Sequence, residues 1–285
     1  MIKSFSDKLA EKINFAKKLI FSKFTIYQYM IFFLVVLHLA SAFFYGFGAG
    51  SLIPVFIAVI TAVSLDLIIE YLKFKKSRIP NSAFFNQFFP SSALISGLFI
   101  GGLLAQGLKL YVYAIAAALA ILSKHAIIVR QKHVFNPANF GILLVSVIFR
   151  VSHTWWVSSP QILVLLFGIF IIWRLKRIYL ALSFLIVYYT ANSAIELLKG
   201  SGISEIYYTI ANGGVVYFFA MFMLIEPKTN PSARKQRIIY GALVAALFIV
   251  FQFYIPEHGL PLALAVGNIF VPALNWVKER FINRH

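Results

Sequence analysis

The sequence predicts an all-α integral membrane protein with about ten transmembrane helices. Of its 285 residues, 61% are hydrophobic and only 12% are charged, and the mean hydropathy is +0.85. The core of a soluble protein of this length could not bury so much apolar surface. The net charge of +17 would suggest a nucleic-acid partner in a soluble protein. Here the basic residues fall between alternate apolar runs, so they mark one side of a membrane and predict no nucleic-acid partner.

Ten apolar runs are long enough, or nearly so, to cross a hydrocarbon core. They lie at 25–45, 52–72, 88–104, 109–129, 135–149, 161–174, 178–198, 207–225, 237–255 and 260–277. The fifth and sixth runs fall short of the usual ~20 residues, which predicts tilted, buried or broken helices there. Ten runs divide into two groups of five, and an odd number of crossings gives the groups opposite orientation, as in inverted-repeat transport folds.

The basic residues predict that both chain termini lie in the cytoplasm. With the N-terminus inside, only Lys109, Arg150 and Lys199 of the 26 Lys and Arg residues fall on the outer side. This asymmetry follows the positive-inside rule and predicts a multi-pass protein of the cytoplasmic membrane. Trp155 and Trp156 in the outer loop, and Trp276 near the inner end of the last run, are expected to anchor in the aromatic belts.

The chain is expected to comprise three regions. Residues 1–24 carry lysines around an apolar stripe at helical spacing, which is typical of a helix lying on anionic lipid and not of a cleavable signal peptide. Residues 25–277 form one polytopic membrane domain. Residues 278–285 form a basic C-terminal tail.

Polar chemistry is densest between Ser123 and Gly141. Asn136 followed by Pro137 predicts a helix start, since Asn caps free backbone N–H groups and Pro has none to satisfy. The positive end of that helix dipole would face a basic stretch and favour an anionic group such as a phosphate. An ordinary basic loop before a capped membrane helix explains the same pattern. The basic and histidine residues of this stretch are Lys124, His125, Arg130, Lys132 and His133.

Asp66 and Glu70 lie one helical turn apart within the second run. A carboxylate at full depth costs roughly 2.5–3.5 kcal/mol on insertion scales, which favours a partner or a water-filled path. An ion pair and a cation or proton relay explain Asp66 equally well, and Asp66 is the candidate for an ion pathway. For Glu70 an ion pair with Lys73 is the better interpretation.

Several kinds of chemistry are excluded or disfavoured. The chain has no cysteine, so it cannot ligate an iron–sulfur cluster through thiolates or use a thiolate nucleophile. His125 and His133 are eight residues apart, which fits no compact zinc motif, and no hydrolytic triad can be identified. Gly97, Gly101 and Gly102 predict close helix packing.

Four sequence blocks resemble the signature blocks of one membrane family. They are Pro90–Leu98 (PSSALISGL), Lys124-His125, Lys132–Gly141 (KHVFNPANFG) and Phe219–Pro231 (FAMFMLIEPKTNP). The family comprises RnfD of the Rnf electron-transport complex and NqrB of the sodium-translocating NADH:quinone reductase, both of them membrane subunits. The resemblance spans about residues 25 to 277 and implies a ten-helix subunit with both termini inside. It also implies flavin-linked electron transfer with other redox subunits or flavoproteins.

This chain departs from the family pattern in two ways. Glu226 and Asn230 replace residues of the family's D-P-K-T-T-P block, and the S-G-A-T-like motif that carries covalent FMN is missing. Trp155, Trp156, Ser158 and Pro160 instead resemble the short, stand-alone branch of the family.

These observations together predict a redox membrane subunit, and not a hydrolase, that holds a flavin (FMN or riboflavin) non-covalently. The main alternative is an ion or solute transporter on the same scaffold, with Asp66 in the pathway. A platform for a docked partner is a third hypothesis, but it leaves the NPANFG block unexplained. The residues expected to hold the cofactor are Ser91, Ser92, Lys124, His125, Lys132, His133, Asn136, Asn139, Lys228 and Thr229.

Overall fold

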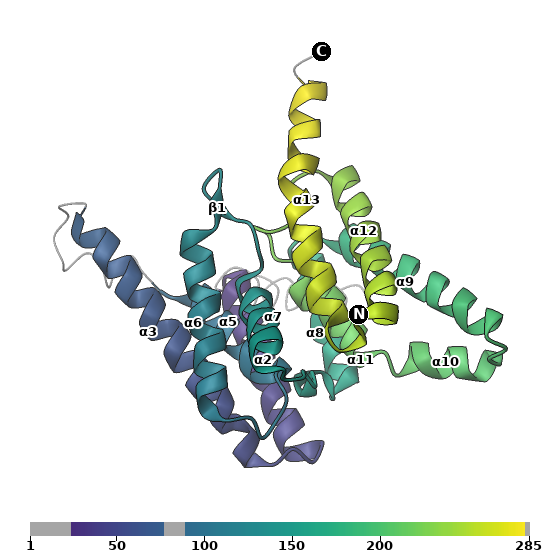
Figure 1. The fold of residues 1–285 in the computed structure, drawn as a ribbon, viewed down its shortest axis with the longest axis horizontal. Coiled ribbons are helices and arrows are strands. Elements are labelled where there is room, and N and C mark those ends of the chain that lie inside the picture. The colour runs from purple at the N-terminus through teal and green to yellow at the C-terminus, as the bar shows by residue number, and fades with distance from the viewer. Residues whose placement is uncertain (1–23, 77–88, 283–285) are drawn as a thin grey trace, which may run out of the picture.

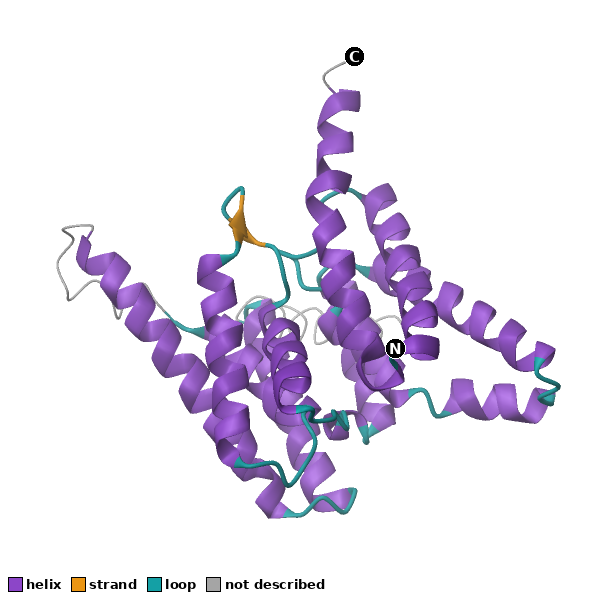
Figure 2. Ribbon diagram, viewed as in Figure 1, coloured by secondary structure: helices purple, strands orange, loops and turns teal. Residues whose placement is uncertain are grey.

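The computed structural model describes residues 24–76 and 89–282 and is almost entirely helical (Figures 1 and 2). The expected N-terminal amphipathic arm lies outside these residues except for Phe24. Of the C-terminal tail, residues 278–282 continue the last helix, and the remainder lies outside the described residues. Each of the ten apolar runs contains a helix, which confirms the all-α membrane class.

The first half of the chain contributes five helices to the bundle. α2 (Ile26–Phe44) is followed by the short helix η1 (Ala49–Ser51) and by α3 (Leu52–Lys76). α5 (Ser91–Leu103), α6 (Leu110–Ala126) and α7 (Pro137–Phe149) complete this half, and α3 packs on both α5 and α6. A small hairpin of β1 (Ile128–Val129) and β2 (Lys132–His133) joins α6 to α7. Arg130 and Gln131 form its turn with positive φ angles.

The second half repeats much of this contact pattern. It contains η2 (Trp156–Ser158), α8 (Gln161–Arg174), α9 (Ile178–Leu198), α10 (Ile203–Ala211), α11 (Gly214–Phe218), the π-helical turn η3 (Phe219–Met223), α12 (Arg234–Tyr254), η4 (Pro256–His258) and α13 (Gly259–Ile282). α12 packs on α9 and α13, much as α6 packs on α3 and α7. The two halves meet where α2 contacts α8 and where α7 contacts α13.

Helix length separates two groups of helices. Five helices of the described residues, namely α2, α3, α9, α12 and α13 with their adjoining turns, are long and apolar enough to cross a membrane. α5, α6, α7 and α8 are apolar but have only 13 to 17 residues. A helix of 13 residues spans about 20 Å, against a hydrocarbon core of about 30 Å. The protein is therefore a multi-pass membrane protein in which several central helices are too short to cross the core unaided.

The run expected at 207–225 is not one straight helix. α10 and the α11–η3 segment are bent by 46° at their junction. The backbone breaks at Gly213, where an added Cβ atom would overlap the Tyr189 hydroxyl, so the Tyr189 side chain occupies the space of a larger residue. The π-turn that follows departs from α-helical bonding, which is common near functional sites.

Small residues let α5 pack closely on α3, as the sequence predicts. A Cβ atom added to Gly97 would lie 2.5 Å from the Cα atom of Val59, and one added to Gly101 would lie 2.5 Å from that of Val55. Backbone atoms cannot move aside cheaply, so both positions require glycine.

The expectation for the outer-loop tryptophans was wrong. Trp155 and Trp156 are 6% and 1% exposed, and the Trp156 indole N–H donates to the Gly101 carbonyl at 2.9 Å. They belong to the interior because η2 folds back against α2 and α5. Trp276, at 44% exposed, remains compatible with an interfacial position.

Candidate functional site

The expected cofactor residues fall into two groups, which lie on different parts of the bundle. Lys124 and His125, at the end of α6, turn toward α3. His133, Asn136, Asn139 and Thr229 gather between the start of α7, the loop after η3 and α13. Lys132 and Lys228 are exposed, and Ser91 and Ser92 lie half-buried at the start of α5.

Asp66, Glu70 and Lys73 of α3 form one cluster with Lys124 and His125 of α6, here called the Asp66 cluster. The Lys124 ammonium donates to both carboxylate oxygens of Asp66, at 2.8 and 3.0 Å. His125 Nε2 lies 2.7 Å from Asp66 Oδ1. The Asp66 side chain is only 1% exposed, so the expected water-accessible surface was wrong and the ion pair is observed.

The Asp66 cluster extends from this buried carboxylate toward solvent. Lys73 donates to Glu70 at 3.0 Å, as expected, and also to His125 Nδ1 at 2.7 Å. One tautomer of His125 satisfies both contacts, because Nδ1 accepts from Lys73 while the Nε2 proton is donated to Asp66. The exposed fraction of the side chains rises from 1% at Asp66 through 10% at His125 to 51% at Lys73. A continuous polar connection therefore joins the interior to the surface.

Asn136 begins α7 in the way the sequence predicts. Its side-chain oxygen accepts from the Asn139 backbone N–H at 3.1 Å, and Pro137 occupies the first helical position. Its own backbone N–H donates to the side chain of Asn268, a residue of α13, at 3.2 Å. These bonds already use two of the backbone donors that a phosphate at this helix end would need.

Asn268 connects three elements through hydrogen bonds. Besides accepting from Asn136, it donates to the Thr229 carbonyl at 2.9 Å and to the Tyr240 hydroxyl at 2.7 Å. Asn139 donates to the Pro261 carbonyl at 2.8 Å. Buried amides satisfied in this way fix the position of α7 against α13 and the loop after η3, where the two halves of the chain meet.

Glu226 is the acidic residue of this region. Its carboxylate lies 2.8 Å from His133 Nε2, which ties β2 to the loop after η3. The Asn230 amide donates to the Glu226 carbonyl at 2.6 Å. His133 is 7% exposed, so it forms a buried structural contact with a carboxylate and does not face an open phosphate site.

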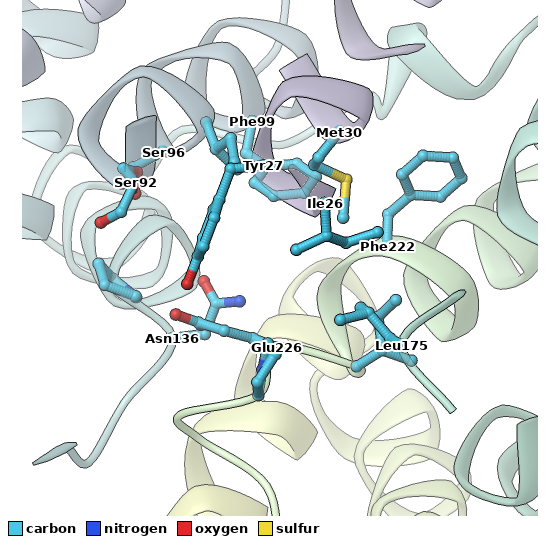
Figure 3. Close-up of a pocket in the computed structure, with 14 residues that line it drawn as sticks. Ile26, Tyr27, Met30, Ser92, Ser96, Phe99, Asn136, Leu175, Phe222 and Glu226 are labelled. Atoms are coloured by element: carbon cyan, nitrogen blue, oxygen red, sulfur yellow. The ribbon is translucent and has the colours of Figure 1, made fainter. Parts of the chain in front are cut away.

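A pocket of about 70 Å³ opens beside Asn136 and Glu226. In Figure 3, Ser92, the Tyr27 hydroxyl, Asn136 and Glu226 gather at one end of it, whereas aromatic and aliphatic side chains line the rest. The N-terminal turns of α2, α5 and α7 all contribute to its wall. The pocket, which we call the Glu226 pocket, is lined by Ile26, Tyr27, Met30, Ser92, Ile95, Ser96, Phe99, Asn136, Pro137, Leu175, Phe222, Ile225, Glu226 and Pro227.

The Glu226 pocket fits a neutral ring better than a phosphate. No lysine or arginine is among its lining residues, and Glu226 would repel an anion. Lys124 is already paired with Asp66, and Lys132 and Lys228 are exposed. Pockets for whole drug-sized ligands measure about 300–1,000 Å³. This pocket therefore admits the edge of a flat ring system unless its walls move.

A second histidine contact occurs near the other end of α5. His153, which precedes η2, and His258, the last residue of η4, approach with ring nitrogens 3.3 Å apart. Burial, and second the neighbouring His258, lower the pKa of His153 to about 4, so its imidazole is neutral at pH 7. Sequence spacing gave no signal for this pair, because the residues are 105 positions apart.

Sequence reasoning also missed Asn268, Tyr27 and the partners of Asp66. Asn268 had a usable signal, since it is an isolated amide within an apolar run and such groups are buried with partners. The Lys124–Asp66 pair had none, because the pairing of α3 with α6 cannot be read from one sequence.

Known proteins with similar sequences agree with this architecture. Residues 160–283 match the family model described as the NQR2, RnfD, RnfE family. The NqrB protein of the Na(+)-translocating NADH-quinone reductase of Chlamydia abortus is 29% identical over 73 residues, and that of Chlamydia caviae is 30% identical over the same length. The resemblance to this family is confirmed. Each match covers 25% of this chain and 14% of the relative, so the chain spans only a small part of the length of these relatives.

Proposed function

We propose that this chain is a membrane subunit of an electron-transport system in the cytoplasmic membrane, working with other redox subunits or flavoproteins. The match of residues 160–283 to the family model supports this, because the matched region supplies η3, Glu226 and Asn268. Most of the Glu226 pocket's remaining wall comes from the first half of the chain. The proposed topology is ten crossings in two inverted repeats with both termini inside, and the similar helix contacts of the two halves support it.

The proposed cofactor is a non-covalently bound flavin, FMN or riboflavin, whose ring edge enters the Glu226 pocket. The observation that carries this proposal is the combination of apolar walls with a polar end formed by Tyr27, Ser92, Asn136 and Glu226. A flavin supplies one- and two-electron redox chemistry when bound. The protein's side chains would orient the ring through hydrogen bonds, exclude water with Phe99 and Phe222, and place a carboxylate beside it. A phosphate, where present, would have to lie outside the pocket.

An absorbance spectrum of the detergent-purified protein tests this proposal. We expect the visible bands of oxidised flavin, lost on acid precipitation because the flavin is not covalently bound. Ser96→Trp, which fills the pocket, should abolish the bands, and Glu226→Gln should weaken them. Lys132→Ala is the matched control and should retain them, since Lys132 is exposed outside the pocket. A colourless wild-type protein after flavin is supplied would refute flavin binding.

Ion-coupled transport is the second candidate, and the Asp66 cluster favours it. Ionisable residues inside a membrane bundle commonly mark ion or proton pathways. Because Lys124 and His125 already contact the Asp66 carboxylate, a sodium ion would meet two nitrogen donors there. A proton is the ion that this arrangement can transfer, through His125. Proton uptake by vesicles containing wild type but not Asp66→Asn would support this function.

A further inference from the structure

His153 and His258 come from opposite halves of the chain and meet at the end of the bundle remote from the Glu226 pocket. His153 follows α7 and lies beside Leu104 at the C-terminal end of α5. His258 ends η4, just before α13. Ser92 and Ser96, which line the Glu226 pocket, lie nearer the N-terminal end of the same α5. Neither histidine has a part in the proposed redox site.

The separation of the two ring nitrogens is that of two ligands on one metal ion. His153 Nε2 and His258 Nδ1 are 3.3 Å apart. In tetrahedral zinc sites the metal–nitrogen bonds are about 2.0–2.1 Å, which places two ligand nitrogens about 3.3–3.4 Å apart. A direct N–H hydrogen bond is usually shorter, at about 2.9–3.0 Å. The rings are inclined by 66°, so they do not stack face to face.

Both histidines sit on fixed backbone. Thr154 N–H and Trp155 N–H donate to the Leu103 carbonyl at 3.0 and 3.2 Å, and Ala105 N–H donates to the Ser152 carbonyl at 3.2 Å. The His258 N–H donates to the Ile255 carbonyl at 3.1 Å. Ligands held in this way lose little conformational freedom when an ion binds. Both side chains are half-buried, which leaves one side open to water and an entering ion.

We propose that His153 and His258 bind a divalent transition-metal ion that favours imidazole, such as Zn²⁺. Within the described residues no group of three or more His, Asp or Glu side chains is arranged to hold a metal, so water completes the coordination. Two protein ligands give weaker, reversible binding than the closed four-ligand sites that build zinc domains. A bound ion would join the α7–α8 loop to η4 and so clamp the two halves of the bundle together.

Thermal unfolding of the full chain in detergent, purified through a histidine-free tag, tests the site with zinc chloride. We expect zinc to raise the Tm of the wild type by several degrees, since an ion that binds only the folded state stabilises it. His153→Gln and His258→Gln should each remove that rise. His285→Gln is the matched control for losing one histidine and should keep it. Magnesium chloride should have no effect, because Mg²⁺ prefers oxygen ligands.

Protection from chemical modification provides a second measurement on the unaltered protein. Zinc should shield His153 and His258 together from diethyl pyrocarbonate, as read by mass spectrometry of their peptides. This result would support the site even where a variant fails to fold. Equal modification with and without zinc, or a zinc-dependent Tm rise that both variants retain, would overturn the proposal. Neither outcome depends on flavin or electron transfer, so the electron-transport proposal stands or falls separately.

Discussion

At the scale of single residues, Asp66 is the most exacting position because its charge is buried and its partner is as well. Removing one member of a buried ion pair leaves the other uncompensated and costs about 3–5 kcal/mol. Asp66→Asn should therefore lower the stability strongly by stranding the Lys124 ammonium, which is 13% exposed. Glu70→Gln should cost below about 1 kcal/mol, since the Glu70 pair with Lys73 is largely exposed. Thermal unfolding of both variants in detergent measures the difference.

Asp66→Asn combined with Lys124→Met is the control for this prediction. The double variant removes both charges and should recover much of the stability lost in Asp66→Asn alone. If the single and double variants unfold at the same temperature, the Asp66–Lys124 contact does not determine stability. Equal tolerance of Asp66→Asn and Glu70→Gln would also contradict the prediction.

Asn268 supports the junction of the two halves through three hydrogen bonds. Asn268→Leu keeps the apolar character of α13 but leaves the Asn136 N–H, the Thr229 carbonyl and the Tyr240 hydroxyl without this partner. Each buried group left unsatisfied costs about 1–3 kcal/mol. We expect a Tm fall larger than that of Asn275→Leu, an amide of the same helix that bonds only to exposed Ser232. A smaller fall in Asn268→Leu would mean that the network is not stabilising.

At the scale of elements, the closest helix contact is that of α5 on α3. Gly97→Ala and Gly101→Ala each place a methyl group against backbone atoms of α3, so the helices must separate. Overpacking of this kind costs typically about 1–3 kcal/mol. Gly50→Ala is the matched control, because a Cβ atom there has no neighbour within 4 Å. The Tm should fall in the first two variants and stay unchanged in the third; equal Tm values in all three would refute the tight contact.

Helix positions were largely predictable, whereas their partners were not. The Asn136–Pro137 start of α7 was visible because capping is a local interaction between neighbouring residues. The break at Gly213 was missed, because it depends on Tyr189 from α9 filling the space beside it. The candidate site divides in the same way. The sequence identified Asp66, Asn136 and Thr229 as polar residues in apolar surroundings, but their partners come from contacts between distant segments.

At the scale of the whole molecule, the chain sorts its basic residues to one edge. Figure 1 shows the β1–β2 hairpin and the C-terminal ends of α3 and α13 toward the upper edge of the view. Lys132 lies on that hairpin, and the described ends of these helices lead into further basic sequence. The loops after α2 and α5 lie toward the opposite edge. This arrangement is the one that the positive-inside rule requires of a protein with this edge in the cytoplasm.

Single cysteines placed in this cysteine-free chain can test the orientation directly. Lys109→Cys and Ser204→Cys lie at exposed positions of the expected outer face, and Lys132→Cys and Lys228→Cys at exposed positions of the inner face. On intact cells a membrane-impermeant maleimide should label the first two and not the second two, since a charged reagent cannot cross the hydrocarbon core. After the membrane is opened with detergent all four should react, which controls for local accessibility. The reverse pattern on intact cells would invert the topology and place the Asp66 cluster and the Glu226 pocket on the outer side.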